Sequence, residues 1–378
     1  MNIAIVCYPT YGGSGVLATE LGKALADVGH NIHFITYQQP VRLAGFHANI
    51  FYHEVRVPTY PLFDYPPYET ALASTMVDVV NNYKIDILHV HYAIPHAAAA
   101  YMAKQILAKQ NKKIPVITTL HGTDITLVGR DKTYSPVVTF SMEESDVLTA
   151  VSNNLREETY KNFSITKPIE VIYNFVDVAR FNKKPVDAFK KLIAPNGERI
   201  IVHASNFRKV KRVDDVLQIF LLLNKVVPSK LLLIGDGPER VRLEQLSREC
   251  ECGSEIKFLG KQEQMEDILP IADLFLLPSE YESFGLAALE AMAAEVPVIS
   301  TNAGGLPEIN INGVCGYMSN VGDVKEMSEN AIAILKNEET YQTFKTNALI
   351  QAKKFDITNI VPLYVKLYER LSNASSPA

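Results

Sequence analysis

This chain of 378 residues contains no tryptophan and only four cysteines. The cysteines form neither a Cys-x-x-Cys pair nor the paired spacing of a zinc site, and a chain of this length can stabilise itself without disulfides. A disulfide scaffold and a cysteine-based metal site are therefore not expected. We predict reduced thiols at Cys7, Cys250, Cys252 and Cys315.

The chain also lacks a large charge excess of one sign and a long apolar run. Its 37 basic and 42 acidic side chains leave a formal net charge of −5, which gives no general electrostatic reason to expect nucleic acid or an anionic membrane as a partner. No apolar run reaches the roughly 18 residues that span a bilayer, and no basic leader precedes an apolar core at the start. We expect a cytoplasmic protein; the sequence leaves homo-oligomer formation open.

Short β-rich apolar runs alternate with helical patterns, which is typical of parallel α/β sheets. The first set of predicted strands covers Ile3–Cys7, Ile32–Thr36, Ile85–Val90 and Pro115–Leu120. The second set covers Ile200–His203, Lys230–Ile234, Ile256–Leu259, Leu274–Leu277 and Val296–Ser300. Two such sets predict an α/β fold with two Rossmann-like domains.

The boundary between the predicted domains falls in a segment rich in prolines and turn residues, at about residues 165–180. We assign residues 1–170 to the first domain and 171–356 to the second. A helical pattern over Thr358–Leu371 follows the last predicted strand. We expect this helix, within residues 357–378, to return to the first domain.

The most informative stretch places Glu282 and Glu290 around an aromatic-glycine turn that opens an apolar helix. Free backbone N–H groups near Phe284, Gly285 and Leu286, together with the helix dipole, could bind a diphosphate. Glu290 is expected about two turns into this segment. The two carboxylates could then accept hydrogen bonds from sugar and ribose hydroxyls. The alternative is an amphipathic helix with solvated Glu residues.

A glycine-rich loop at Gly12–Gly15 follows the first predicted strand and precedes a helical pattern that begins at Val16. Such a loop lets the backbone approach a phosphate or carboxylate closely. It matches neither the Gly-x-Gly-x-x-Gly fingerprint nor a nucleotide-triphosphate loop, which disfavours hydride transfer and phosphate hydrolysis. A purely structural turn is the alternative.

A basic stretch over residues 206–212 follows the first strand of the second domain, at the edge where open α/β sheets bind ligands. Cations there would stabilise a departing diphosphate more strongly than the intact substrate. We choose Lys211 and Arg208 for this role. A solvated basic helix start is the alternative.

His121, in the segment Leu-His-Gly-Thr-Asp, ends a predicted strand of the first domain. Its polar neighbours Thr123 and Asp124 favour a role in a site over a purely structural one. His89 and His91 share one strand face and superficially suggest a metal pair. Because no cysteine or carboxylate ligand set accompanies them, we do not predict a metal site.

These motifs together resemble the retaining glycosyltransferases of family 4, which have the GT-B fold. The pair Glu282 and Glu290 matches the Glu-x7-Glu motif of that family, and the resemblance covers essentially the whole chain. It implies two Rossmann-like domains facing a central cleft, with a C-terminal crossover helix. The first domain would bind the acceptor and the second the sugar nucleotide.

More narrowly, the chain resembles family members that move N-acetylglucosamine from UDP-N-acetylglucosamine to the hydroxyl of L-malate in bacillithiol biosynthesis. The motifs involved are Tyr65–Tyr68, His89–His96, Leu120–Asp124 and Asn206–Arg212, besides the glycine-rich loop. Many family members carry Arg five residues before the motif lysine, whereas this chain has Asn206 there and Arg208 two residues later.

The resemblance implies a role for each matching residue. Glu290 would hold the ribose, Glu282 the donor sugar, and Lys211 with Arg208 the diphosphate, while His121 would lie near the reacting sugar. The implied catalytic residues are His121, Lys211 and Glu282. The implied donor-binding residues are Gly13, Ser14, Gly15, Asn206, Arg208, Lys211, Glu282, Ser283, Phe284, Gly285, Leu286 and Glu290. The implied acceptor-binding residues are Ser14, Tyr92 and Thr123.

The sugar nucleotide would be a substrate, and no cofactor or metal is implied. Other functions stay open from the residues: a sugar-nucleotide epimerase, a family 4 enzyme with a different acceptor, or a non-catalytic sugar-nucleotide-binding regulator. The epimerase would alter the donor without any acceptor, and the regulator would bind it without forming product.

Overall fold

The computed structural model describes the chain except for residues 59–60, 62–63, 182–186 and 376–378, so the end of the expected C-terminal tail lies outside the described residues. The chain divides into two compact units: unit 1 contains Met1–Asn174 and the segment from Thr358 onward, and unit 2 contains Phe175–Ile357. A boundary after residue 170 would cut strand β7 (Ile169–Val171), which pairs with β6 (Val147–Ala150) in unit 1. The observed boundary therefore lies after this strand.

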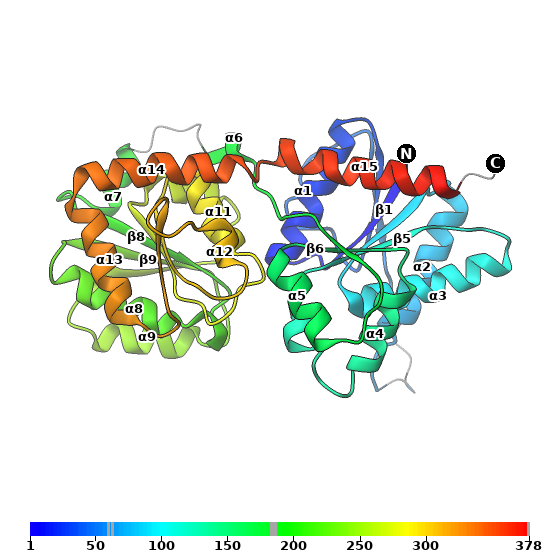
Figure 1. Ribbon diagram of the computed structural model, residues 1–378, viewed down its shortest axis with the longest axis horizontal. Helices are drawn as coiled ribbons and strands as arrows, with labels where there is room; N and C mark the ends of the chain where they lie inside the picture. Colours follow the sequence, from blue (N-terminus) through cyan, green and yellow to red (C-terminus); the bar gives the residue numbers. More distant parts are fainter. Residues whose placement is uncertain (59–60, 62–63, 182–186, 376–378) are drawn as a thin grey trace. The chain divides into compact units, whose positions relative to one another are not determined.

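Unit 1, drawn in blue to green with the red helix α15 in Figure 1, contains a seven-stranded parallel sheet. Its strand order is β3-β2-β1-β4-β5-β6-β7. The remaining strands are β1 (Asn2–Val6), β2 (Asn31–Thr36), β3 (Ile50–Glu54), β4 (Ile87–His91) and β5 (Val116–Leu120). The sequence patterns missed β3, β6 and β7. The side chains of β3 are half-buried or exposed because this strand lies at the sheet edge, and β7 has only three residues, so neither shows a clear apolar run.

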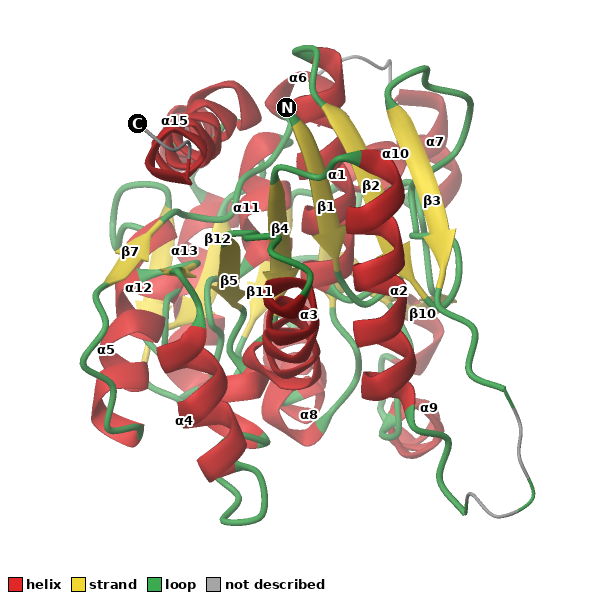
Figure 2. Ribbon diagram, turned by 90° about the vertical axis from the view of Figure 1, so that its right-hand side faces the viewer, coloured by secondary structure: helices red, strands yellow, loops and turns green. Residues whose placement is uncertain are grey.

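The helices of unit 1 pack against the sheet (Figure 2), and two of them contribute to one apolar cluster with the strands. Leu72 and Met76 on one helix and Ala99 and Ala103 on the next are fully buried in the same apolar cluster. The elements are α1 (Gly13–Asp27), α2 (Tyr68–Tyr83), η1 (Ala93–Ala97), α3 (Ala98–Lys109), η2 (Thr123–Leu127), α4 (Ser135–Glu144), α5 (Asn153–Asn162) and α15 (Ile357–Ser375).

The C-terminal helix α15 packs on unit 1 through buried aromatic side chains. Tyr364 and Tyr368 are 4% and 0% exposed, and the Tyr368 hydroxyl lies 2.8 Å from Nδ1 of His89 on β4. A residue near the C-terminus thus hydrogen-bonds to the centre of the first sheet.

Unit 2 contains a six-stranded parallel sheet in the order β10-β9-β8-β11-β12-β13. The strands are β8 (Arg199–Ala204), β9 (Ser229–Ile234), β10 (Ile256–Gly260), β11 (Leu274–Leu277), β12 (Val298–Thr301) and β13 (Gly316–Ser319). The two sheets confirm the prediction of an α/β fold with two Rossmann-like domains. The sequence patterns missed β13, which has only four residues and includes a glycine.

The helical elements of unit 2 contribute to one apolar core in which Phe220, Leu223 and Met327 are fully buried. The helices are α6 (Val178–Phe181), α7 (Asp187–Ile193), α8 (Val213–Asn224), α9 (Arg240–Glu249), α10 (Met265–Ile268), α11 (Leu286–Ala293), α12 (Leu306–Ile309), α13 (Val324–Lys336) and α14 (Glu338–Lys353). The shorter helical turns are η3 (Lys209–Lys211), η4 (Gly253–Glu255) and η5 (Leu269–Ile271).

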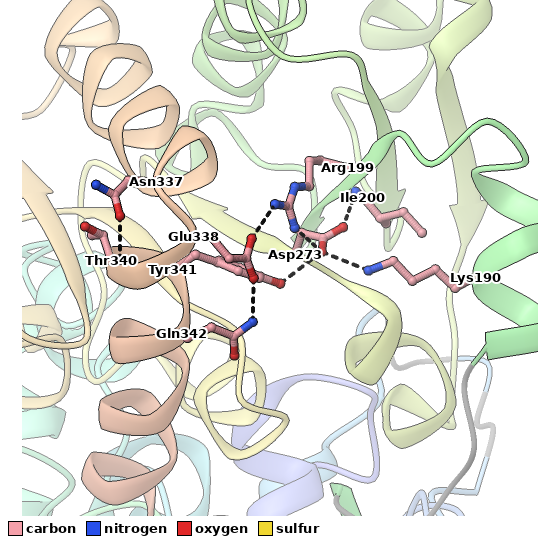
Figure 3. A network of polar contacts seen from close by, with 9 residues as sticks. All are labelled: Lys190, Arg199, Ile200, Asp273, Asn337, Glu338, Thr340, Tyr341 and Gln342. Carbon is pink, nitrogen blue, oxygen red and sulfur yellow. Dashed lines mark hydrogen bonds and ion pairs between the residues drawn. The ribbon is translucent and has the colours of Figure 1, made fainter.

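A buried carboxylate joins four elements at the amino ends of the unit 2 strands (Figure 3). Asp273, just before β11, is 1% exposed. It accepts hydrogen bonds from Nζ of Lys190 at 2.8 Å, Nη1 of Arg199 at 3.3 Å, the Ile200 amide at 2.8 Å and the Tyr341 hydroxyl at 2.9 Å. This network connects α7, β8 and α14 to the start of β11.

Each sheet has one point where the strand order reverses, between β1 and β4 in unit 1 and between β8 and β11 in unit 2. Loops that leave neighbouring strands there turn to opposite faces of the sheet and leave a crevice at the carboxyl ends. The site residues that the sequence predicts follow these four strands and β5, the neighbour of β4.

Candidate functional site

The unit 2 switch point brings Lys211 and Glu282 together. Lys211 ends the turn η3 after β8, and Glu282 lies in the loop between β11 and α11. Nζ of Lys211 donates to Oε1 of Glu282 at 2.7 Å, and the hydroxyl of Ser279 donates to the same oxygen at 2.8 Å. The two charged side chains are only 19% and 13% exposed. Because burial restricts both, the pair is far better ordered than a surface ion pair.

Two adjacent glycines, Gly304 and Gly305, pack closely against the Glu282 loop. The sequence patterns did not single them out. The amide of Gly305 donates to the carbonyl oxygen of Glu282 at 2.8 Å. A Cβ atom on Gly304 would lie 2.0 Å from that same oxygen, and one on Gly305 would lie 2.5 Å from the carbonyl oxygen of Ser283. Two adjacent glycines shortly after a strand were the available signal, since they allow another loop to approach closely.

Replacing Gly304 with Ala should therefore displace the Glu282 loop. Gly304 has a φ of +61°, so the substitution adds backbone strain to the steric conflict and should cost about 1–3 kcal/mol of unfolding free energy, with a loss of catalytic rate. Gly313→Ala is the matched control, because Gly313 has a φ of +72° but nothing within 4 Å of an added Cβ. Urea unfolding and kcat should separate the variants: equal kcat values in both would contradict the supporting role of Gly304.

Helix α11 begins one residue after Gly285, whose φ of +97° turns the chain into the helix. Leu286 is the first helical residue, and the half-buried Ser283 and buried Phe284 precede it. The Phe284 ring contacts that of Phe355 with centroids 5.6 Å apart. The helix thus starts where the sequence predicted.

Glu290 is the fifth residue of α11. It therefore lies about one turn into the helix, at about 1.5 Å rise per residue, rather than the two turns expected. The expectation was wrong because the residues between Glu282 and Leu286 belong to the loop and contribute no helical turn.

The loop after β8 carries the basic stretch, and the next loop of the sheet supports it. Added Cβ atoms on Gly235 and Gly237 would lie 1.8 Å and 2.2 Å from the carbonyl oxygens of Ser205 and Asn206. Asn206 and Arg208 are exposed. No ion pair engages Arg208 within the described residues, so its guanidinium is available to a ligand, whereas Arg212 pairs with Asp215 at 2.7 Å.

In unit 1, the glycine-rich loop ends in α1, which begins at Gly13 rather than at Val16 as expected. The helix starts before Val16 because the amides of Gly15 and Val16 both donate to the carbonyl oxygen of Gly12. An added Cβ on Gly15 would lie 2.4 Å from the carbonyl oxygen of Tyr8, which explains the need for glycine there. Gly13, Ser14 and Gly15 thus form the first turn of α1 at the unit 1 switch point.

Ser14 and Tyr92 meet across this switch point. The Ser14 hydroxyl lies 2.6 Å from the Tyr92 hydroxyl, although 78 residues separate them in the chain. Tyr92 has a φ of +86°, which is rare for a side chain of this size, and its ring centroid lies 5.1 Å from that of His121. Thr123 is exposed and begins η2, directly after the glycine that follows His121. The structure therefore groups the predicted acceptor-side residues with His121 at the carboxyl ends of β1, β4 and β5.

A buried carboxylate connects the loops after β4 and β5. Asp124 is 2% exposed and accepts hydrogen bonds from the amides of Ala93 at 2.9 Å and Gly122 at 3.0 Å. Burial raises the pKa of Asp124 to about 6, despite the backbone N–H groups that favour its charged form. In the sequence, Asp124 was identifiable only as a polar neighbour of His121. Its connecting role could not be predicted there because Ala93 lies 31 residues away.

Histidines line the buried face beneath this loop pair. His89 and His91 stack with ring centroids 4.5 Å apart, as predicted from their alternation on β4. His91 also lies against His121, with 2.8 Å between Nδ1 of His91 and Nε2 of His121. Burial lowers the pKa of His89 and of His121 to about 3 and that of His96 to about 4, so these rings are neutral at pH 7.

Stability should consequently fall as the pH is lowered. At a pH below the ordinary histidine pKa of about 6.5, each neutral histidine takes up a proton when the protein unfolds. This uptake lowers the free energy of unfolding by about 1.4 kcal/mol per pH unit for each residue. His89, His96 and His121 together outweigh Asp124, whose raised pKa of about 6 gives a single contribution of opposite sign, lost as the pH rises through 6. Unfolding free energies measured from pH 7 to pH 5 should decrease steeply, and His89→Gln should reduce the slope by one proton. A flat profile would contradict neutral burial.

The described residues contain no group of three or more His, Cys, Asp or Glu side chains arranged to hold a metal ion. Among the helices in the described part of the chain, none is both long and apolar enough to cross a membrane.

Two family models together match most of the chain. The model of "Glycosyltransferase Family 4" matches residues 11–180, and that of "Glycosyl transferases group 1" matches residues 186–351. The chain is 46% identical over 370 residues to N-acetyl-alpha-D-glucosaminyl L-malate synthase of Bacillus anthracis, covering 97% of this chain and 96% of that protein. It is also 27% identical to an uncharacterised glycosyltransferase of Methanocaldococcus jannaschii, covering 97% of each.

Solved structures share the fold at low sequence identity. A sucrose-phosphate synthase from Thermosynechococcus elongatus has a TM-score of 0.82 at 22% identity, covering 99% of this chain and 100% of that one. HepE of Anabaena, solved in complex with UDP-glucose, has a TM-score of 0.82 at 18% identity, covering 98% of this chain and 100% of that one. The architecture is thus that of the GT-B glycosyltransferases.

Proposed function

Because the chain belongs to the family 4 glycosyltransferases, we propose that it transfers N-acetylglucosamine from UDP-N-acetylglucosamine to the hydroxyl of L-malate, with retention of configuration. The reaction would be the first step of bacillithiol biosynthesis. The name of the relative from Bacillus anthracis, which is 46% identical over 97% of this chain, supports this sugar and this acceptor. The enzyme would work in the cytoplasm without a metal or cofactor.

The Lys211–Glu282 pair at the unit 2 switch point carries the donor part of the proposal. Lys211 donates to a carboxylate at 2.7 Å, so a diphosphate entering the crevice would meet an ordered ammonium group. Arg208, exposed on the same loop, adds a second cation. The first amides of α11 are suited to phosphate oxygens, since a helix N-terminus carries partial positive charge. Glu290, one turn further, is suited to the ribose hydroxyls.

The acceptor part of the proposal rests on unit 1. Ser14 and Tyr92 present two hydroxyls 2.6 Å apart, and Thr123 adds a third on an exposed turn. Hydroxyl groups of this kind can hydrogen-bond the carboxylates of a small dicarboxylic acid. Many other combinations could hold a small anion, so malate is favoured by the relative rather than by these contacts.

We propose that the leaving diphosphate oxygen accepts the proton of the malate hydroxyl while the new bond forms on the same face of the sugar. The bond from the anomeric carbon to the diphosphate breaks, and the carbon bonds to the malate oxygen. Negative charge then grows on the diphosphate, which Lys211 and Arg208 would stabilise more strongly than in the substrate. The other bound groups would contribute positioning.

Purified protein should be incubated with UDP-N-acetylglucosamine and a panel of hydroxy acids and sugars. Release of UDP with L-malate, and an α-linked product by NMR, would support the proposal. Product with another acceptor only would reassign the acceptor within the family. Epimerised donor without any acceptor would indicate an epimerase, and donor binding without product for every acceptor would indicate a regulator.

A further inference from the structure

The side chain of His121 is held by a single neighbouring imidazole. His91 ends β4 and His121 directly follows the adjacent strand β5, with Nδ1 of His91 2.8 Å from Nε2 of His121. The His121 ring is half-buried, and no residue in the described part of the chain hydrogen-bonds to its Nδ1. Its Nδ1 is therefore the atom left for a ligand. The ring nitrogen that carries the shared proton decides whether Nδ1 of His121 donates or accepts a hydrogen bond.

Both rings are neutral, so the pair has two arrangements. In the first, His91 donates from Nδ1, and His121 carries its own proton on Nδ1. In the second, His121 donates from Nε2, and His91 must carry its proton on Nε2. That Nε2 atom of His91 is buried and has no hydrogen-bond partner among the described residues. The second arrangement would bury an N–H group without an acceptor, which proteins rarely do.

The neighbouring His96 shows that this region accommodates a bare Nε2. Nδ1 of His96 must donate to the carbonyl oxygen of His91, because a carbonyl can only accept. Its Nε2 therefore carries a lone pair, and this atom is also buried without a partner in the described residues. An unprotonated Nε2 on His91 repeats a state that the structure already requires at His96, five residues further along the chain.

We propose that His91 is a positioning residue that donates from Nδ1 to His121 and holds His121 in the tautomer protonated at Nδ1. This inference rests on the proposed function for its consequence: His121 would then donate a hydrogen bond to an oxygen of the donor sugar or its leaving group. It could not act as the base that removes the malate proton. That role stays with the diphosphate oxygen, and atoms balance without a protein base.

The tautomers can be read directly in the free protein. Long-range ¹H–¹⁵N correlation spectra of the full chain labelled with ¹⁵N-histidine, at neutral pH, should show both His91 and His121 protonated at Nδ1. Single-histidine variants assign the signals. An Nε2-protonated His121 in the wild-type protein would overturn the inference, and it would do so whether or not the protein is a transferase.

Two substitutions extend the test to the reaction. In His91→Asn the side-chain amide takes the place of Nδ1 and can still donate, so His121 should keep its tautomer and the enzyme most of its rate. In His91→Leu the donor is lost: His121 should change to Nε2 protonation, and kcat should fall about 10- to 100-fold with a smaller change in KM. His89→Leu removes a ring that stacks on His91 but does not hydrogen-bond to His121, so the tautomer of His121 should stay unchanged.

The results separate the two proposals. A wild-type kcat in a folded His91→Leu protein would overturn the positioning role. Absence of transferase activity in the wild type would instead overturn the proposed function, while the tautomer spectra would still decide the His91–His121 assignment. If His91→Leu fails to fold, the wild-type spectra and His91→Asn provide the decision.

Discussion

Replacing Lys211 with Ala is expected to lower kcat by about 100- to 1,000-fold, the usual cost of removing one preorganised group that stabilises developing charge. The reason is that the ammonium group of Lys211 is already ordered by Glu282 at 2.7 Å and is only 19% exposed. An ordered cation needs no rearrangement as the diphosphate departs. Steady-state kinetics with UDP-N-acetylglucosamine and malate would measure the effect, with KM changing less than kcat.

Lys209→Ala is the matched control for this experiment. Lys209 carries the same charge on the same turn η3, but its side chain is exposed, and no ion pair holds it within the described residues. It should therefore change kcat by no more than about two-fold, because exposed charges are well screened. If the two variants lost activity equally, general basicity of the loop would explain the effect. An unaltered kcat in Lys211→Ala would remove its proposed role.

Replacing Asp273 with Asn should reduce the unfolding free energy by about 3–5 kcal/mol, the typical cost of breaking a buried charge network from one side. Asp273 is 1% exposed and accepts from Lys190, Arg199, Ile200 and Tyr341. Asparagine keeps the shape but removes the charge, and its amide nitrogen turns one acceptor into a donor. Urea unfolding at neutral pH would measure the loss.

Glu338→Gln tests the same network at its exposed end. Glu338 accepts from Nη2 of Arg199 at 3.2 Å, but its side chain is 65% exposed. Water replaces such a partner readily, so the expected loss is about 1 kcal/mol or less. Equal destabilisation by the two substitutions would show that burial of Asp273 does not govern the energy of the network.

The Lys211 and Asp273 predictions concern opposite edges of one sheet. Lys211 follows β8 at its carboxyl end, whereas Asp273 precedes β11 at its amino end. The first substitution should lower kcat with little loss of stability, and the second should lower stability while folded molecules keep their kcat. The loops at the carboxyl ends of the unit 2 strands thus carry the candidate catalytic residues, whereas the loops at the amino ends stabilise the fold. This division is expected for parallel α/β sheets.

Local patterns in the sequence were sufficient for much of this fold. The start of α11 at Gly285 and Leu286 could be predicted because an aromatic-glycine turn before an apolar helix is a local signal. The alternation of apolar runs predicted both parallel sheets for the same reason. Strand β7 was missed because it has only three residues, and β13 because its glycine and serine interrupt the apolar run that marks the equally short β11.

Residue types and spacing by themselves determined two Rossmann-like domains, the family resemblance and the identity of Lys211, Glu282 and His121 as candidates. Only the tertiary structure decided what each of them touches: Glu282 at Lys211, Gly305 at Glu282, and His91 at His121. These partners come from other strands, and their meeting depends on the order in which strands pair. Strand order is set by packing of the whole sheet, so no local pattern in the chain encodes it.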